Sequence, residues 1–523
     1  MNYKTRIAAL AASVGIVALA GACRPDLNIT NPNAPDVARA VATPGDVRNL
    51  IGNSFHTWYF SMQGTDACGP CPGVANAVMA DNLTMAFGNF GARFNGQEPR
   101  LAFNNSSSAS DGHVSSDQYD ALYGALGAAN DGLNAIKRGI KVAKSVNDSD
   151  ETPQFQAFAY LIQGLTLSWE SLLFDKGFVV DEDTPSGGAT LQAYPEVNAA
   201  ALPKFDKAIA AAAGQSWTVP NTFTPGMTLT ADRLAQFANT MAARTIAYMP
   251  RTAAEAATTD WAKVLAYAEK GISSGTPFTL QITGDNNLWY DYLKYYGESE
   301  SWVRVDHRVM QLMDPRQPVE WTSTTPPEPP VASADARLAS DFTFNEAVPF
   351  NPARGVYFFS QWQHTRYFFH SFESETGGAV GNVPFVLPAE NDLLIAEALI
   401  RTGGDKVRAA GLINNTRVGR GNLPALTGGE ATNVLIGAIF YERDIELMNT
   451  GASQPWFDRR RIEPGAVTPE GVPIGNTWAF KGGSNLQLGT PRHFPLPAKE
   501  LETLGLPVYT YGGAPPNPVW PEH

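Results

Sequence analysis

Two glutamates near the C-terminus, Glu442 and Glu446, are one helical turn apart and are the first candidates for chemistry in this sequence. Hydrolysis of a glycosidic bond requires two carboxyl groups about 5–9 Å apart, one of them with a raised pKa. However, arginines that lie close by lower the pKa of a carboxyl group, which is the wrong direction for a general acid. We therefore expect no enzymatic activity and predict a structural clasp. In this clasp the chain turns back after Gly451 and pairs the two glutamates with Arg459, Arg460 and Arg461.

A second candidate is the motif Cys68-Gly-Pro-Cys71, which matches the redox motif of thioredoxin-like proteins. That chemistry requires a strand before the motif and a helix after it within a βαβ unit, and the flanking residues show no parallel-sheet pattern. In an exported protein, two cysteines this close are expected to form a local disulfide. Unpaired cysteines and redox catalysis remain alternatives.

Aromatic residues gather in two stretches, 285–302 and 355–372. Sugars present flat C–H faces edged by hydroxyl groups, so a sugar-binding site needs exposed rings flanked by polar side chains. The candidate ligand-binding residues are Trp289, Tyr290, Tyr292, Asn286, Asn287 and Trp362. The alternative is that these rings belong to the hydrophobic core.

Composition excludes several other classes of function. The net charge is −13 at pH 7, whereas nucleic acid binding requires clustered Lys and Arg. The acids of the loop 181–188 lack the glycine and the final glutamate that a calcium-binding loop requires. The seven histidines show no metal-ligand spacing, and no phosphate-binding loop is present, so we expect neither a metal nor a cofactor.

The N-terminus has the pattern of a lipoprotein signal. Lys4 and Arg6 precede an apolar run that ends in small residues directly before Cys23, and this run is too short to span a bilayer. We interpret residues 1–22 as a signal peptide, Cys23 as the site of lipid attachment, and residues 23–45 as a tether. Acyl chains on Cys23 would anchor the protein to a membrane.

The remaining chain predicts a mainly helical fold. Apolar residues recur with helical spacing in a series of blocks separated by polar breaks, which we interpret as helical hairpins with long loops and a few short strands. The expected helices are Tyr119–Val146, Gln154–Phe174, Leu202–Ala213, Ala231–Tyr248, Trp261–Ile272, Ala389–Arg401, Asp405–Val418 and Asn433–Met448, with a further helix starting at Thr43–Pro44.

Several motifs carry a resemblance to a known family. The segment Tyr441–Arg461, with its Glu-Arg pair, its glycine and its Trp-Phe-Asp-Arg-Arg run, resembles the C-terminal signature of the SusD/RagB family of nutrient-binding outer-membrane lipoproteins. Further segments resemble elements of this family in the same order: Asp314–Arg316, Pro384–Gly404, Leu412–Leu426 and Pro491–Glu502.

The resemblance implies a tetratricopeptide-like scaffold, with an N-terminal helical region over residues 46–300 and a C-terminal SusD/RagB region over residues 301–523. It also implies a protein anchored at the cell surface that captures oligosaccharides or other oligomeric nutrients and delivers them to a TonB-dependent, SusC-like outer-membrane barrel. The alternatives are a helical scaffold that binds proteins rather than glycans, and a secreted hydrolase or thiol oxidoreductase.

Overall fold

The computed structural model divides the chain into two units, Met1–Ala42 and Thr43–His523, and every described helix and strand lies in the second unit. The residues that the structure describes are 41–63, 72–85, 96, 100–109, 113–185, 187–275, 278–285, 288–299, 303–317, 331–345, 360–367, 380–451, 453–462, 465–472, 474 and 486–513. The predicted signal peptide, Cys23, Cys68, Cys71, Asn286 and Asn287 lie outside these residues, and the predictions made for them stay predictions.

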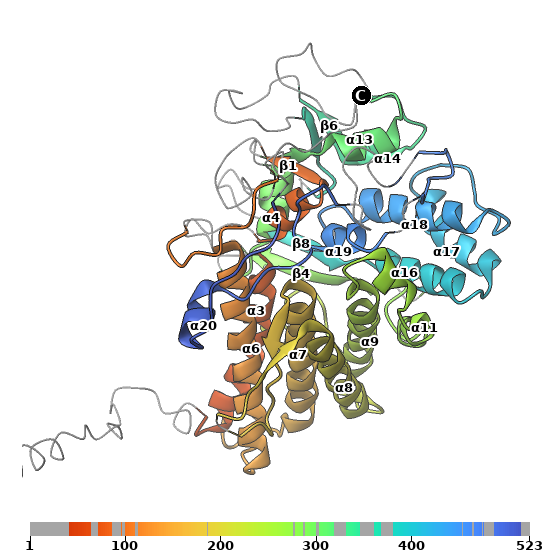
Figure 1. The fold of residues 1–523 in the computed structure, drawn as a ribbon. Helices are drawn as coiled ribbons and strands as arrows, with labels where there is room; N and C mark the ends of the chain where they lie inside the picture. The colour runs from red at the N-terminus through yellow and green to blue at the C-terminus, as the bar shows by residue number, and fades with distance from the viewer. Residues whose placement is uncertain are drawn as a thin grey trace, which may run out of the picture. The chain divides into compact units, whose positions relative to one another are not determined.

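Two successive series of helices form most of this unit (Figure 1). The first consists of α3 (Pro44–Gln63), α6 (His113–Lys137), α7 (Thr152–Leu173), α8 (Tyr194–Ala212) and α9 (Ala231–Tyr248); the second consists of α11 (Trp261–Ala268), α16 (Pro388–Arg401), α17 (Lys406–Arg417) and α18 (Thr432–Glu446). Helix α6 packs against α3 and α7, α8 packs against α7 and α9, and α11 contacts both α9 and α16. Helices adjacent in the sequence are thus adjacent in space, as in a stack of helical hairpins, and the predicted mainly helical, tetratricopeptide-like fold is confirmed.

Shorter elements occupy the connections. The short helices are α4 (Pro72–Met79), α10 (Ala253–Ala257), α12 (Tyr292–Lys294), the π-helical turn η1 (Tyr295–Ser299), α13 (His307–Met313), α14 (Arg337–Asp341), α19 (Gln454–Arg459) and α20 (Ala498–Thr503). The strands form antiparallel pairs: β1 (Leu83–Met85) with β5 (Val303–Val305), β2 (Lys176–Phe178) with β3 (Leu191–Ala193), β4 (Leu280–Asp285) with β8 (Val380–Val386), and β6 (Phe342–Phe344) with β7 (Trp362–His364). Two of these pairs, β1–β5 and β4–β8, join the predicted regions 46–300 and 301–523.

Helix boundaries follow local sequence signals. Helix α9 coincides with its predicted range, and its N-cap Thr230 accepts a hydrogen bond from the backbone N–H of Arg233. Helix α6 ends at Lys137, before the predicted end, because Gly139 adopts a left-handed conformation with φ +88° that terminates the helix. Among the described helices, none is both long enough and apolar enough to cross a membrane.

Close backbone contact fixes α18 against the loop that follows α19. A Cβ atom at Gly437 of α18 would lie only 1.7 Å from the carbonyl oxygen of Val467. Because this neighbour is backbone and not a flexible side chain, relief of the clash would require the loop to move away from the helix.

We predict that Gly437→Ala lowers the free energy of unfolding by about 1–3 kcal/mol, as overpacking does in a well-packed core. The matched control is Gly411→Ala in α17, where a Cβ would meet no atom within 4 Å, and this change should stabilise by about 0.5–1 kcal/mol. Urea denaturation of both variants measures the difference. Equal stabilities of the two variants would show that the Val467 contact does not constrain the helix.

A buried carboxyl group lies in α7. Glu170 is 2% exposed and lies close to the hydroxyl group of Tyr123. Burial raises the pKa of Glu170 well above its ordinary value; a hydrogen bond with Tyr123 opposes this change, and the charges of Asp175 and Glu500 add to it. The folded protein therefore keeps a proton on this carboxyl group to a higher pH than the unfolded chain does.

This proton uptake makes stability depend on pH. The unfolded chain loses the proton of Glu170 near pH 4–5, whereas the folded protein keeps it to a higher pH. The free energy of unfolding therefore falls as pH rises above this range, until the folded-state pKa of Glu170 is reached. We predict that Glu170→Gln, which needs no proton, is more stable than the natural protein by about 1–3 kcal/mol at pH 7 and by little at pH 4. Thermal unfolding at both pH values tests this, with the exposed Glu196→Gln as the control. A stability difference that does not change with pH would contradict the prediction.

Candidate functional site

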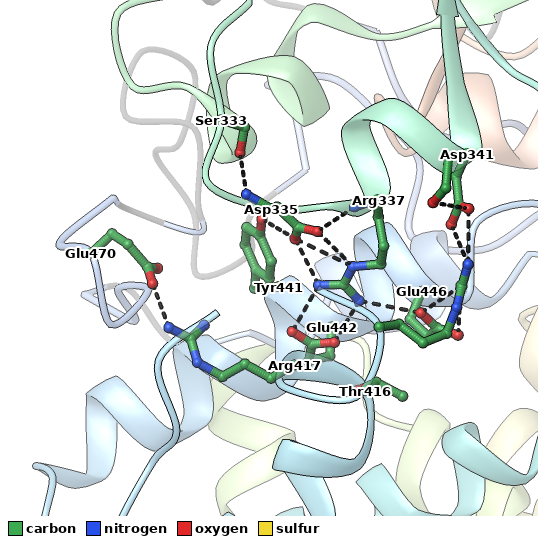
Figure 2. A network of polar contacts seen from close by, with 12 residues as sticks. Ser333, Asp335, Arg337, Asp341, Thr416, Arg417, Tyr441, Glu442, Glu446 and Glu470 are labelled. Carbon is green, nitrogen blue, oxygen red and sulfur yellow. Dashed lines mark hydrogen bonds and ion pairs between the residues drawn. The ribbon is translucent and has the colours of Figure 1, made fainter. Parts of the chain in front are cut away.

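The two glutamates of α18 pair with an arginine that precedes them by more than a hundred residues (Figure 2). Arg337, on α14, donates from Nη1 to Glu442 Oε2 at 2.6 Å and from Nη2 to Glu442 Oε1 at 3.1 Å. The same guanidinium pairs with Asp335 at 2.8 Å, and Asp335 also accepts a hydrogen bond from the Tyr441 hydroxyl at 2.8 Å. The side chains of Arg337, Asp335 and Glu442 have no solvent exposure.

Glu446 extends the network to two further segments. Its carboxylate lies 3.2 Å from Arg337, 3.0 Å from Arg366 and 2.9 Å from Arg420. Arg420 also pairs with Asp341 at the end of α14, at 2.8 Å. The network therefore joins α18 to α14, to the residues after β7 and to the turn after α17.

We predicted that these glutamates pair with Arg459, Arg460 and Arg461. This prediction is wrong, because the three arginines make other contacts. Arg461 pairs with Glu397 of α16 at 2.8 Å and with Asp458 at 2.5 Å, and Arg459 lies 3.7 Å from Asp81. After Gly451 the chain enters α19, which carries the arginine run toward α16 and α4 instead of back over Glu442.

Glu397 is the centre of this second buried cluster. Burial would raise its pKa, but Arg461, Arg443 and Arg401 hold the pKa of Glu397 well below its ordinary value. Its carboxylate is bound by all three guanidinium groups, at distances of 2.7–2.8 Å. The clasp is thus two separate arginine–carboxylate clusters, one around each of Glu442 and Glu397.

Arg460 and Arg251 bind backbone carbonyls at helix ends. Arg460 donates to the carbonyls of Leu172 and Tyr248 at 2.8 Å, and Arg251 donates to Leu172 at 2.7 Å and to Ser171 at 2.6 Å. These carbonyls belong to the last turns of α7 and α9, where partial negative charge accumulates and intrahelical donors are absent. Burial lowers the pKa of Arg251 to about 10.

This geometry gives Glu442 and Glu446 no access to a substrate. Both oxygens of Glu442 are bound by Arg337, and the side chain is fully buried. Arg337 lowers the pKa of Glu442, as a nearby arginine was expected to, but burial has the larger effect and the net pKa is raised, so the expected net lowering is wrong for this residue. A general acid must reach the leaving-group oxygen, and Glu442 cannot.

The aromatic stretch after β4 forms a cluster of tyrosines. The ring centroids of Tyr290 and Tyr292 are 4.3 Å apart, those of Tyr292 and Tyr296 are stacked at 6.0 Å, and those of Tyr295 and Tyr296 are 5.0 Å apart. Tyr290, Tyr295 and Tyr296 are half-buried, and Tyr292 is buried. We call these four residues the tyrosine surface. It lies on a hydrophobic cluster built by α4, β1 and β5.

Two buried carboxylates position the tyrosine surface. Asp291 caps α12 by accepting from the backbone N–H of Lys294 at 2.9 Å and also pairs with the Lys294 ammonium at 2.9 Å. At the other end, Glu298 lies 2.7 Å from Nδ1 of His364 and accepts from the backbone N–H of Tyr367 at 2.7 Å. These contacts fix the ends of the segment that carries the rings, and η1 is the kind of irregular turn that is common at functional sites.

The predicted ligand-binding residues differ in how far their side chains are buried. Trp289 is 4% exposed and packs against the rings of His56 at 4.6 Å and Tyr59 at 5.7 Å. Trp362, on β7, is 8% exposed and lies against Phe344, and Tyr292 is 6% exposed. These three side chains are core residues in this structure, as the alternative interpretation expected, whereas Tyr290 is partly open to solvent.

An acidic group on the loop after β2 is neutralised by lysines. Among the described residues, Asp181, Glu182 and Asp183 are the acids close enough to one another to share a metal ion. However, Lys204 lies 2.7 Å from Asp181, Lys207 lies 3.1 Å from Glu182, and Lys137 lies 2.5 Å from Asp183. These ammonium groups supply the positive charge that a metal would otherwise provide.

Comparison with known proteins identifies the fold. No family model matches the sequence, and no curated protein matches it. Among solved structures, a SusD superfamily protein from Parabacteroides distasonis matches over 88% of this chain and 98% of its own, with 12% identity and a TM-score of 0.64. This chain has the SusD fold. Also similar is a SusD-like carbohydrate binding protein from Bacteroides vulgatus, with 13% identity and a TM-score of 0.54 over 80% of this chain and 83% of its own. Surface glycan-binding protein A from Bacteroides uniformis matches with 14% identity and a TM-score of 0.52 over 79% of this chain and 87% of its own.

The motif resemblance is therefore confirmed as a SusD-like fold. The sequence reasoning missed Arg337, because the local sequence around it gives no indication that it meets Glu442 in the fold. It also passed over Tyr295 and Tyr296 as site residues, although they stand in the aromatic stretch that it singled out.

We predict that Arg337→Met lowers the free energy of unfolding by about 3–5 kcal/mol, because it leaves Asp335 and Glu442 buried without their counter-charge. The control is Arg408→Met, whose guanidinium pairs with Glu269 at the surface and should contribute less than about 1 kcal/mol. Chemical denaturation of both proteins gives the comparison. A loss for Arg337→Met as small as for Arg408→Met would show that the cluster does not hold the fold together.

Proposed function

We propose that this SusD-like protein is a cell-surface lipoprotein that binds oligosaccharides, or other oligomeric nutrients, and delivers them unaltered to a TonB-dependent, SusC-like outer-membrane barrel. The observation that carries the binding function is the tyrosine surface. Three half-buried tyrosines, Tyr290, Tyr295 and Tyr296, lie with their rings beside one another. Such a surface matches the apolar faces and the hydroxyl edges of a sugar chain.

The fold supports a binding function over an enzymatic one. Similar structures include a SusD-like carbohydrate binding protein and a surface glycan-binding protein, and we extend that activity to this chain as a proposal. The paired glutamates that could have suggested hydrolysis are buried and bound by Arg337. Capture and release require no chemical step.

The location and the transfer step rest on the sequence. The apolar run before Cys23 has the character of a lipoprotein signal, and acyl chains on this cysteine would hold the protein at the outer membrane. The SusC-like partner follows from the family resemblance, in which the lipoprotein covers the barrel and passes on its ligand. Isolation of the protein from outer membranes with a co-purifying barrel would test this step.

We predict that Tyr290→Ala and Tyr296→Ala each weaken oligosaccharide binding by about 1–3 kcal/mol, since each removes a ring from the stacking surface. The measurement is isothermal titration calorimetry with the best ligand from a panel of soluble oligosaccharides. The control is Tyr267→Ala on α11, a half-buried tyrosine outside the surface, which should leave the affinity unchanged.

Two results would argue against this assignment. If no oligosaccharide in the panel binds the natural protein, the helical scaffold interpretation gains, which the core positions of Trp289 and Trp362 favour. If binding is retained in both tyrosine variants, the protein binds glycans at another surface.

A further inference from the structure

A pocket of about 340 Å³ lies between α20 and the start of α6, and the function proposed above does not use it. Its volume falls within the range of about 300–1,000 Å³ that is typical of small-molecule sites. Ser106 and Ser107 line it from the segment before α6, Asp120 from α6, and Lys499 and Glu502 from α20. None of its lining residues belongs to the tyrosine surface.

The walls of the pocket are held in place by hydrogen bonds to the C-terminal segment. Asn105, which also lines the pocket, donates from Nδ2 to the carbonyl of Leu496 at 2.9 Å and to the carbonyl of Tyr509 at 2.8 Å. The backbone N–H of Phe103 donates to the carbonyl of Tyr511 at 3.0 Å. A preformed pocket of this kind loses little conformational entropy on binding.

The lining of the pocket contains both polar and apolar groups. Serine hydroxyls and carboxylates provide hydrogen-bond donors and acceptors, while Ala109, Pro497 and Ala498 provide apolar surface. A hydroxyl-rich ring with apolar C–H faces satisfies both parts of such a lining. The size of the pocket suits one or a few such rings rather than a long chain.

The net charge of the lining side chains limits the class of ligand that the pocket can bind. Three carboxylates, Asp117, Asp120 and Glu502, line the pocket against one ammonium group, Lys499. An anionic ligand would be repelled by this excess of negative charge, because like charges brought together cost free energy. Although all three are described residues, these carboxylates do not lie close enough together to share a metal ion.

We propose that this pocket binds a single neutral sugar residue and is a second carbohydrate site, separate from the tyrosine surface. The inference goes beyond the proposed function, which requires only the tyrosine surface. Asp120 and Glu502 accept hydrogen bonds from the sugar hydroxyls, the serines add donors, and uronic acids are excluded by charge.

The test uses the methyl α-pyranosides of glucose, galactose, mannose and xylose as probes of the full-length protein. Binding is detected by saturation-transfer NMR and quantified by titration for the best probe. Asp120 is exposed, so Asp120→Asn should fold normally, and it should weaken binding at least fivefold. Ser107→Trp, which fills the pocket, should abolish binding. The matched control is Asp148→Asn, an exposed aspartate outside the pocket, and it should bind as the natural protein does.

Further measurements separate this pocket from the tyrosine surface. Monosaccharide binding should survive in Tyr290→Ala, and glucuronate should not bind. The inference is overturned if none of the four probes binds, if both pocket variants bind normally, or if Tyr290→Ala loses the monosaccharide. In the last case the tyrosine surface would be the site of the monosaccharide, and the proposed function would stand without the pocket.

Discussion

Buried pairing between arginine and carboxylate is the interaction on which this fold depends. Arg337 and Glu442 are both fully buried, and removal of two charges from water is costly unless each is matched by a partner at close range. Here each charge has several partners: Arg337 meets Asp335, Glu442 and Glu446, and Glu397 meets Arg401, Arg443 and Arg461. Apart from the local pairs Asp335–Arg337 and Glu397–Arg401, these partners come from segments that are far apart in the sequence. They can meet only when the helices are correctly stacked, so the clusters favour one arrangement of the chain.

The same principle applies to buried arginines that have no carboxylate partner in the described part of the chain. Arg251 and Arg460 replace the missing intrahelical donors at the ends of α7 and α9. Both also donate to the carbonyl of Arg492, and so they connect α19 and the C-terminal segment to the first helical series. Charges that could have suggested catalysis are therefore used in the interior of the scaffold. The tyrosine surface lies on short elements that connect the two helical series, and the proposed sugar pocket lies between α20, the start of α6 and the segment before α6. This division is typical of proteins in which a rigid scaffold presents variable loops.

Much of the scaffold could be predicted from the sequence. Helical periodicity predicted α9 with its correct bounds, and the motifs around Glu442 and Trp456 indicated the SusD fold, because both signals are local. Pairing over long distances could not be predicted. An arginine such as Arg461 can reach several carboxylates, and only the packing of α19 against its neighbours decides that it meets Glu397 and not Glu442. The burial of individual aromatic side chains could not be predicted either. Trp289 and Tyr290 are adjacent in the sequence, yet Trp289 packs against α3 and Tyr290 is partly open to solvent.

A crystal structure of the protein with a bound oligosaccharide tests the central claim most directly, because it locates the ligand and shows whether it is intact. The account predicts an uncleaved sugar chain lying against the rings of Tyr290 and Tyr296, with the arginine clusters unchanged. A glycan bound away from these rings, or a cleaved glycan beside a carboxylate pair, would contradict it.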